Sequence, residues 1–363
     1  MSKYYKPGYY SRNSRRKTSF FHKIFHFLLV VIIILAGYYS FKLYQTFYKT
    51  NVWLDGKKTI SIYIPKNADF NDVKKLLYEK GIIINRNTFE WLAKYKKYDK
   101  HIISGRYVFL PDMNNYDIIN ILRSGKQKPV KVVFNSIRTK EKFASVISKQ
   151  IEADSASIIK LLNDSVYLSK FNFNTQSIYG MFIPNTYEFY WNTSAKKFME
   201  RMFKEYNKFW NKKRREKADE LKLSLNEIST LASIIEQETS KNQEKPVIAG
   251  VYINRLKRKW RLQADPTLIF ALGDYNIRRV LDEYKNIDSP YNTYKYAGLP
   301  PGPICIPSIS SIDAVLNYEK HKYFYFCAKE DLSGYHNFAS SYSGQLKNAR
   351  KYRKALNKLK IMK

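Results

Sequence analysis

The chain has 363 residues, of which 44% are hydrophobic and 16% aromatic, enough apolar material for two or three folded domains. Lysine and arginine total 64 against 31 acidic residues, a formal net charge of +33. Such a charge favours a polyanionic partner (nucleic acid, anionic lipid or an acidic wall polymer), although a lysine-rich proteome would give the same bias. The sequence has no phosphate loop, no dinucleotide fingerprint and no Cys/His cluster with metal-ligand spacing, so we expect neither a metal nor another cofactor.

The first predicted element is a membrane-spanning helix at residues 24–44. Its apolar part, from Ile24 to Phe41, contains no Lys, Arg, Asp or Glu. As a helix it would cover about 27 Å, close to the hydrocarbon thickness of a bilayer. Tyr38 and Tyr39 lie near its far end, where an aromatic belt is expected.

Residues 1–23 form a basic tail, and no acidic residue precedes Asp55. The positive-inside rule places this tail in the cytoplasm and the bulk of the chain on the periplasmic, or extracytoplasmic, side of the cytoplasmic (inner) membrane. That location argues against a nucleic-acid partner. The alternative is a cleaved signal peptide, but the basic region is long and no A-x-A site follows the apolar run.

The second predicted region, residues 45–130, is a small α+β module together with the linker that leads into it. The polar linker itself is expected over residues 42–57. The expected elements are a strand at 59–65, a helix at 72–80, a strand at 105–110 and a helix at 116–123. Gly81 and Gly125 follow the two helices in the manner of C-caps.

Residues 131–363 predict a larger domain of helices and short strands, so the fold class is α+β. The expected helices cover 139–153, 155–164, 195–220, 224–240, 245–259 and 311–318, and the expected strands cover 130–135 and 323–328. An irregular Pro-, Gly- and Tyr-rich loop from Ser289 to Ser310 is long enough to indicate a functional loop.

The helix that begins at Ser224 carries the most informative pattern. Ser224 and Glu227 form a capping box, and the apolar residues that follow occupy one arc of the helix. Glu236 and Glu238 lie at the two borders of this apolar face. A carboxylate beside apolar surface has a raised pKa and can donate a proton near neutral pH, although such a residue is more commonly solvated or salt-bridged.

Two cysteines and one histidine leave alternatives open. Cys305 and Cys327 could form a disulfide in an oxidising compartment, but two isolated cysteines in a long chain are more often buried small hydrophobic residues. His336 is either a ligand contact or, as we favour, a surface residue.

Several segments, taken in order, resemble the endolytic murein transglycosylase (YceG-like) family. They are YGMFIPNTYEF at 179–189, ASIIEQET at 232–239, VIAGVYINRL at 247–256, RLQADPTLIFALG at 261–273, SPYNTYKYAGLPPGPI at 289–304 and YFYF at 323–326. The resemblance covers roughly residues 20–360, including the membrane span and a LysM-like, glycan-binding module before the catalytic part.

The resemblance implies that Glu236, the first Glu of A-S-I-x-E-x-E-T, is the catalytic acid, with Glu238 in a supporting role. Supporting or substrate-binding roles are implied for residues of the other segments: Tyr187, Gln263, Asp265, Thr267, Tyr291, Asn292, Thr293 and Tyr294. The loop from Gly298 to Pro303 would line the glycan groove with them.

The implied chemistry cleaves the MurNAc–GlcNAc bond of peptidoglycan without water. A lytic transglycosylase uses the 6-hydroxyl of its own substrate as nucleophile, so one carboxyl group can act first as acid and then as base and leave a 1,6-anhydroMurNAc end. A glycosidase needs two carboxyl groups. The partners implied are glycan strands and, as a family-level expectation, peptidoglycan synthases or division proteins.

Two other functions stay open: a non-catalytic wall-binding or division-scaffold protein on the same fold, and a hydrolase that pairs Glu236 with Asp265. Asp265 could equally be the N-cap of a helix with Pro266 at N1, and the tyrosines at 291–296 could pack the loop. The chain departs from the family pattern at Gln345, where a His is common, and at Asn135–Ser136, where a Gly is common.

Overall fold

The computed structural model describes residues 1–4, 8, 20–277 and 279–358 of the chain. It divides into two compact units, residues 1–127 and 128–363. Most of the predicted basic tail lies outside the described residues. The LysM-like character of the first unit stays a prediction.

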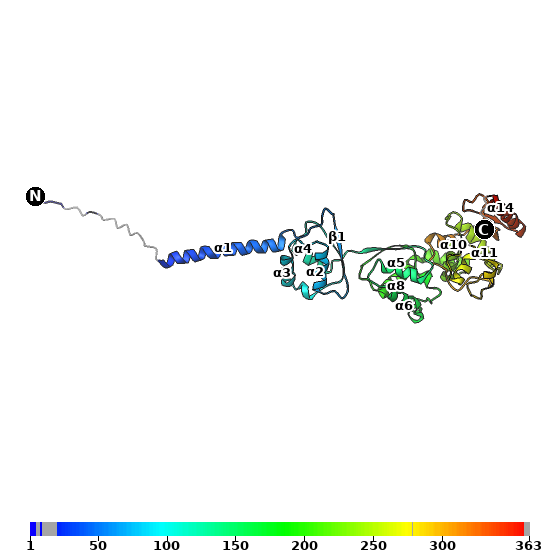
Figure 1. Ribbon diagram of the computed structural model, residues 1–363, viewed down its shortest axis with the longest axis horizontal. Helices are drawn as coiled ribbons and strands as arrows, with labels where there is room; N and C mark the ends of the chain where they lie inside the picture. Colours follow the sequence, from blue (N-terminus) through cyan, green and yellow to red (C-terminus); the bar gives the residue numbers. More distant parts are fainter. Residues whose placement is uncertain (5–7, 9–19, 278, 359–363) are drawn as a thin grey trace. The chain divides into compact units, whose positions relative to one another are not determined.

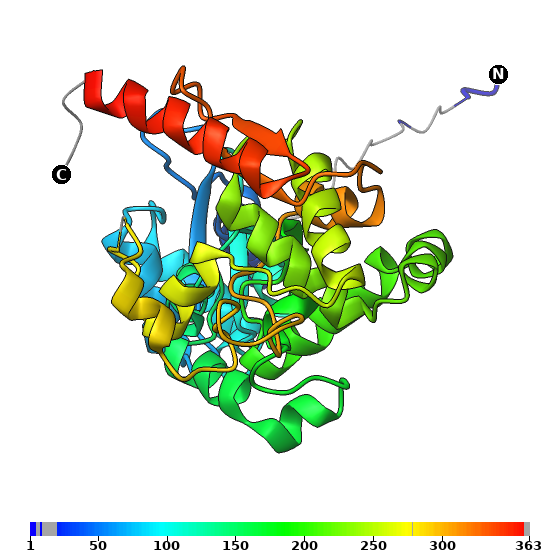
Figure 2. The same cartoon turned by 90° about the vertical axis from the view of Figure 1, so that its right-hand side faces the viewer.

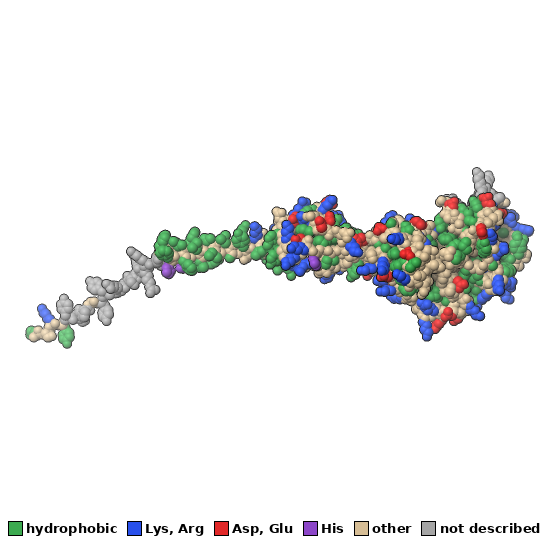
Figure 3. Space-filling model, turned by 90° about the horizontal axis from the view of Figure 1, so that it is seen from below, with side chains coloured by type: hydrophobic (Ala, Val, Ile, Leu, Met, Phe, Trp, Pro, Cys, Tyr) green, Lys and Arg blue, Asp and Glu red, His purple; other side chains and the backbone are tan. Residues whose placement is uncertain are grey.

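The first unit begins with α1 (Phe20–Tyr48), a helix of 29 residues (Figure 1). Its side chains are apolar and exposed around most of its length (Figure 3). Among the described residues it is the helix long and apolar enough to cross a membrane. The predicted linker over 42–57 is wrong. The helix continues to Tyr48, and the next residues enter the module, where Val52 and Leu54 are buried. Because most of this stretch is polar, the sequence did not indicate that Val52 and Leu54 would be buried.

The rest of the first unit is a two-stranded antiparallel sheet covered by short helices. Strand β1 (Ile60–Ile64) pairs with β2 (Gly105–Phe109), and the helices are α2 (Phe70–Glu79), α3 (Arg86–Tyr95), the 3₁₀ turn η1 (Tyr98–Lys100) and α4 (Asn115–Ser124). Alternate strand residues such as Ile62 and Tyr107 are fully buried and form one core with the helices. Both predicted strands and both predicted helices of the module are confirmed, whereas α3 was missed.

Local signals fix these helix ends. Asp69 forms a capping box with Asp72 at the start of α2, and Asn114 forms one with Asp117 at the start of α4. Gly125 ends α4 in the left-handed conformation, at a φ of 66°, which a residue without a Cβ adopts freely.

The second unit opens with another two-stranded sheet and a layer of helices. Strand β3 (Val130–Phe134) pairs with β4 (Asn185–Phe189), and between them lie α5 (Lys140–Ser148), α6 (Ser155–Asn163), α7 (Ser165–Ser169) and the 3₁₀ turn η2 (Ile178–Met181). The helix predicted over 139–153 therefore ends early, at Ser148.

Helices α8 (Ala195–Phe209) and α9 (Lys212–Leu221) replace the single helix predicted over 195–220. The break has a packing cause, because Trp210 turns out of the helix and is almost fully buried. Asn211 then caps α9 through its side chain, which accepts a hydrogen bond from the Arg214 N–H.

The remaining elements carry the predicted motifs. They are α10 (Leu225–Glu238), α11 (Lys245–Lys257), α12 (Asp265–Leu272), the 3₁₀ turn η3 (Asp282–Asn286), α13 (Ile309–Leu316), the antiparallel strands β5 (Tyr325–Ala328) and β6 (His336–Ala339), and α14 (Tyr342–Lys358). Helix α10 packs against α11, α12 and α13, while α14 lies along the β5–β6 hairpin (Figure 2).

Candidate active site

The last turn of α10 carries the two predicted carboxylates. The helix begins at the expected capping box, in which Ser224 and Glu227 each bond the backbone of the other. Its face from Ile228 to Ile235 is buried, and this packing fixes where the last turn points. Residues 236, 237 and 238 are each rotated by about 100° from the one before, so their side chains enter three different surroundings.

Glu236 lies in a polar pocket between α10, α11 and α13. One of its oxygens, Oε2, accepts hydrogen bonds from Lys245 Nζ at 3.0 Å, from Ser311 Oγ at 2.5 Å and from Ser308 Oγ. Lys245 is only 4% exposed in its side chain and Glu236 16%. This is a largely buried ion pair whose polar atoms are hydrogen-bonded.

The predicted rise in the pKa of Glu236 is wrong. Burial alone would raise it, but hydrogen bonds from Ser308, Ser311 and Lys245, together with the charge of Lys245, outweigh burial and lower the pKa below its ordinary value. Helical periodicity identified the apolar border correctly but could not reveal the donors, which come from other elements. Glu236 is therefore ionised at neutral pH.

Glu238 lies in a different pocket. Its Oε1 accepts one hydrogen bond, at 2.5 Å, from the hydroxyl of Tyr252 on α11. Burial raises the pKa of Glu238 to about 7; the Tyr252 bond and Arg255 oppose this rise, and the charge of Asp265 adds to it. Burial also keeps the pKa of Tyr252 well above its ordinary value, so this hydroxyl stays protonated and donates. The raised pKa predicted for a carboxylate at the border of the apolar face is therefore confirmed for Glu238 and not for Glu236.

Arg255 holds the other side of this pocket. It is buried, and its guanidinium donates to the backbone carbonyls of Phe324, at 2.7 Å, and Leu262, at 2.5 Å. It thereby ties α11 to the segment before β5 and to the segment that leads into α12. The same contacts bring its positive charge close enough to influence Glu238.

Asp265, Gln263 and Tyr294 form the more open side of the site. The side chains of Gln263 and Asp265 are exposed, and Asp265 Oδ1 accepts a hydrogen bond from the Tyr294 hydroxyl at 2.5 Å. Asp265 is not the N-cap of α12, because the cap position is Ala264. Its carboxylate is thus available to the site. Gln263 has a φ of 50°, held by a 3.0 Å bond from its N–H to the Thr293 carbonyl.

Four other predicted residues build the loop that supports this side. Thr267 and Thr293 are buried and joined through their hydroxyls at 2.8 Å, and Asn292 bonds the carbonyls of Lys285 and Ile287. Tyr291 packs its ring on Phe270. These contacts match the packing alternative for Tyr291 and assign Asn292, Thr267 and Thr293 to loop architecture.

Two further predicted positions also lie in packed surroundings. Tyr187 is a core residue of β4 whose hydroxyl donates to the carbonyl of Ile183, so it is not brought together with the carboxylates. In the Gly298–Pro303 loop, a Cβ at Gly302 would lie 2.2 Å from the carbonyl oxygen of Gln176. Only glycine allows this close backbone approach.

The two cysteines are unbridged, and His336 contacts another side chain of the protein. Cys305 and Cys327 are free thiols, and Cys305 is buried. His336 is not a surface residue as favoured: it is half-buried, and its Nδ1 lies 3.0 Å from the carboxylate of the buried Glu244. Gln345 bonds the Phe326 carbonyl.

No group of three or more His, Cys, Asp or Glu side chains arranged to hold a metal occurs in the described part of the chain.

Sequence reasoning missed Lys245, Tyr252, Ser308 and Ser311. Tyr252 was within a recognised segment, VIAGVYINRL, but nothing in its spacing distinguished it from a packing residue. The serines are close to Glu236 only in space, because they are separated from it by 72 and 75 positions.

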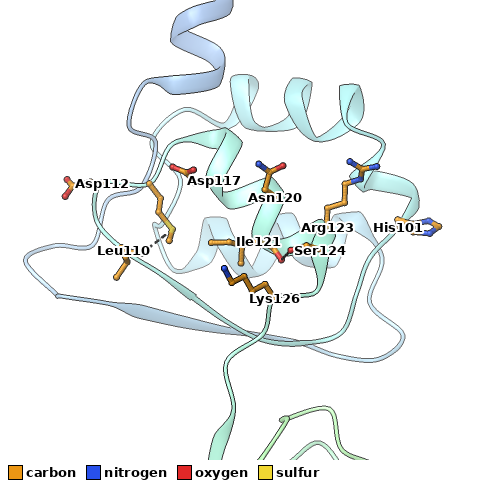
Figure 4. Close-up of a pocket in the computed structure, with 10 residues that line it drawn as sticks. His101, Leu110, Asp112, Asp117, Asn120, Ile121, Arg123, Ser124 and Lys126 are labelled. Carbon is orange, nitrogen blue, oxygen red and sulfur yellow. Dashed lines mark hydrogen bonds between the residues drawn. The ribbon is translucent and has the colours of Figure 1, made fainter.

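A groove on the first unit is lined by other residues. It has a volume of about 880 Å³ and runs along α4, with Asp117, Asn120 and Arg123 on the helix and Leu110 and Asp112 from the loop after β2 (Figure 4). Its lining is mostly polar and charged, and its apolar side chains are Leu110, Met113 and Ile121.

Fold and site together define an α+β protein with a protonatable carboxyl group, an adjacent exposed carboxylate and an N-terminal apolar helix. The model of the YceG-like family matches residues 62–351, and the chain belongs to this family.

Named relatives agree with this assignment. The chain is 31% identical to an endolytic murein transglycosylase of Bacillus subtilis, over 76% of this chain and 81% of that protein. It is 26% identical to an endolytic murein transglycosylase of Streptococcus pneumoniae, covering 84% of this chain but 60% of that longer protein. A crystal structure of a YceG-like protein from Listeria monocytogenes matches with a TM-score of 0.55 and 29% identity, over 80% of this chain and 99% of that one.

Proposed function

We propose that this chain is a membrane-anchored lytic transglycosylase that cleaves the MurNAc–GlcNAc bond of peptidoglycan strands and leaves 1,6-anhydroMurNAc ends. Membership of the YceG-like family and the names of the bacterial relatives support the substrate and reaction class. The observation that carries the chemistry is Glu238, a carboxyl group whose pKa burial raises to about 7 and which lies close enough to the exposed Asp265 to be influenced by its charge.

In this proposal Glu238 moves the proton. Its carboxylic acid protonates the glycosidic oxygen as the bond from that oxygen to the MurNAc C1 breaks. The MurNAc 6-hydroxyl then bonds to C1 and returns its proton to the Glu238 carboxylate. One C–O bond breaks and one forms, and water is not consumed. Tyr252 orients the carboxyl group through its 2.5 Å bond.

Glu236 has the other role. The sequence predicted it as the proton donor, and that role stays a prediction open to test. Its ion pair with Lys245 and its serine donors instead support a positioning function, in which it fixes the end of α10 against α11 and α13.

Asp265, Gln263 and Tyr294 face the substrate. The positive charge that develops at C1 in an oxocarbenium-like transition state is stabilised by the Asp265 carboxylate. The Tyr294 hydroxyl holds that carboxylate, and the exposed Gln263 amide is placed to bond sugar hydroxyls.

The membrane anchor and the module complete the proposal. Helix α1 would cross the cytoplasmic membrane with the basic N-terminal tail inside and the small module and the second unit outside. The groove along α4 would hold a stretch of glycan chain, as expected of a LysM-like module. Synthases or division proteins as partners remain a family-level expectation.

Product analysis tests this function. Purified glycan strands are digested with the full-length chain in detergent and with Glu238→Gln, and the ends are identified by mass spectrometry. We expect anhydro ends with the wild type and about a thousandfold fewer with Glu238→Gln. Glu220→Gln, an exposed substitution on α9, is the matched control. Reducing ends would indicate a hydrolase, and intact strands that bind the wild-type protein would indicate a scaffold; either result overturns the proposal.

A further inference from the structure

Helix α1 is joined to the module without a flexible linker. The side chain of Asn115, at the start of α4, donates to the carbonyl of Thr46 in the last turns of α1 at 2.9 Å. Asn51 donates to the Asn115 side-chain oxygen at 2.6 Å and to the Asn85 carbonyl at 3.0 Å. Asn51, Asn115 and Thr46 are all buried. Since a buried amide is costly to leave unpaired, this network holds the helix and the module in one orientation.

A collar of aromatic side chains surrounds this joint. We define the collar as Phe47, Tyr48, Trp91, Tyr95 and Tyr116. The Phe47 ring lies 6.3 Å from that of Trp91 and 6.1 Å from that of Tyr95, and Tyr48 lies 6.0 Å from Tyr116. Although these rings contact one another, Trp91 is 47% and Tyr95 66% exposed. Large aromatic side chains exposed together around one point need an apolar or interfacial partner.

The position of the collar along α1 indicates that partner. A hydrocarbon layer of about 30 Å takes about 20 helical residues, so a span that begins at Ile24 ends near Leu43. Phe47 is then about 6 Å beyond the hydrocarbon, within the headgroup layer. Trp and Tyr concentrate at this depth because their rings are apolar and their N–H and O–H groups are polar.

Basic side chains lie at the same level. Lys49 directly follows α1, and Lys94 lies on α3 between Trp91 and Tyr95; both are exposed. Lys96 has its ammonium group 3.5 Å from the centre of the Tyr116 ring. Ammonium groups beside amphipathic rings match the phosphates of a phospholipid surface.

We propose that the collar docks the module on the phospholipid headgroup layer of the membrane that α1 crosses. The hydrogen-bonded joint fixes the tilt of the module relative to α1, and the collar fixes its height. The module then presents the groove along α4 at one distance from the membrane rather than over a range of distances. This inference rests on the membrane anchoring proposed above.

Tryptophan emission tests the docking, because neither α1 nor the N-terminal tail contains Trp. The full-length chain is placed in phosphatidylcholine nanodiscs that contain lipid with a nitroxide either on the headgroup or in the middle of an acyl chain. We expect the headgroup nitroxide to quench more strongly. Trp91→Tyr should reduce the quenched emission about twofold, because it removes the interfacial indole and keeps an interfacial ring. Trp260→Tyr, a partly exposed position in the second unit, is the matched control and should leave the quenched emission unchanged.

The outcomes are separable. Equal quenching of the wild type and Trp91→Tyr, or stronger quenching from the acyl position, would overturn docking at the headgroup layer. A collar covered by a protein partner would also give equal quenching. A chain that fails to enter nanodiscs would refute the anchoring itself, and the docking with it, while leaving the product analysis of the transglycosylase proposal unaffected. Trp91→Phe, in which the ring packing on Phe47 is also kept, repeats the measurement with a second variant.

Discussion

Glu236 and Glu238 lie two positions apart on one helix, yet their pKa values move in opposite directions. Both are removed from water, which by itself raises the pKa of each. Glu236 has three donors on one oxygen, including a buried ammonium group, whereas Glu238 has one phenolic donor and a neighbouring carboxylate. The number and charge of partners, and not burial alone, therefore decide which carboxyl group can hold a proton.

The opposite pKa shifts also indicate different roles for the two glutamates, a structural role for Glu236 and a chemical role for Glu238. Three elements meet at Glu236, so its ionised form stabilises the fold. Glu238 has a raised pKa, so its ionisation at higher pH costs stability, which is typical of groups that serve a reaction. The predictions below test this division, from the largest expected effect to the smallest.

The largest effect is expected on the rate. Glu238→Gln should lower the rate of strand cleavage about a thousandfold, because the amide cannot supply the proton. Its thermal unfolding at pH 7 should stay cooperative, with no loss of stability. The measurement is the initial rate of anhydro-end formation, beside an unfolding curve for each variant. A rate within a few-fold of wild type would return the role of acid to Glu236.

The next effect is on stability. Glu236→Gln leaves the ammonium group of Lys245 buried without its counter-charge, so the free energy of unfolding should fall by about 4 kcal/mol. Glu236→Gln combined with Lys245→Met should recover part of this loss, since no uncompensated charge remains. Denaturant unfolding of the single and double variants measures both. Because the pKa of Glu236 is lowered in the folded state, its contribution is present above the ordinary pKa of a glutamate and should fade as the pH falls through the folded value.

A smaller effect of opposite sign is expected from Glu238 as the pH rises. Its folded pKa is raised to about 7, so its contribution to stability is complete below the ordinary pKa of 4.5 and is lost as the pH rises through 7. At pH 8 to 9, Glu238→Gln should therefore be more stable than the wild type, by roughly 3 kcal/mol at most. Unfolding curves at pH 5 and at pH 8.5 give the comparison. Equal stability differences at both pH values would contradict a raised pKa.

The smallest effect is a displacement of the pH–rate profile. Activity should fall as the pH rises above about 7, where Glu238 loses its proton. Asp265→Asn removes a charge that raises the pKa of Glu238, so this decline should move to lower pH. Tyr252→Phe removes a hydrogen bond that lowers it, so the decline should move to higher pH. Profiles that shift in the same direction would refute the assignment of the decline to Glu238.

The fold was largely predictable where local chemistry decides it. The capping box at Ser224 and the terminal Gly125 gave helix ends within a few residues of those observed. Helices α3 and α14 and strands β4 and β6 were missed. The two strands have only five and four residues and owe their form to the strands that they pair with. The break at Trp210 was missed because a helical sequence pattern runs through it.

The sequence predicted which segments form the site but not how their side chains are arranged in space. Asp265 was left between helix capping and substrate contact; the cap position is Ala264, and Asp265 instead bonds Tyr294, 29 positions away, so capping is excluded and substrate contact stays a prediction. Tyr187 and Thr267 share segments with exposed residues but point into the core, a distinction that depends on packing around each side chain.

By itself the sequence determined an apolar helix of membrane-spanning length, a basic tail before it, and an apolar-faced helix that ends in two carboxylates. Those properties depend on composition and on local periodicity. Only the tertiary structure decided which carboxylate could carry a proton. The partners that set the two pKa values come from α11, α13 and the start of α12, and such electrostatic interactions depend on distances in space that sequence separation does not specify.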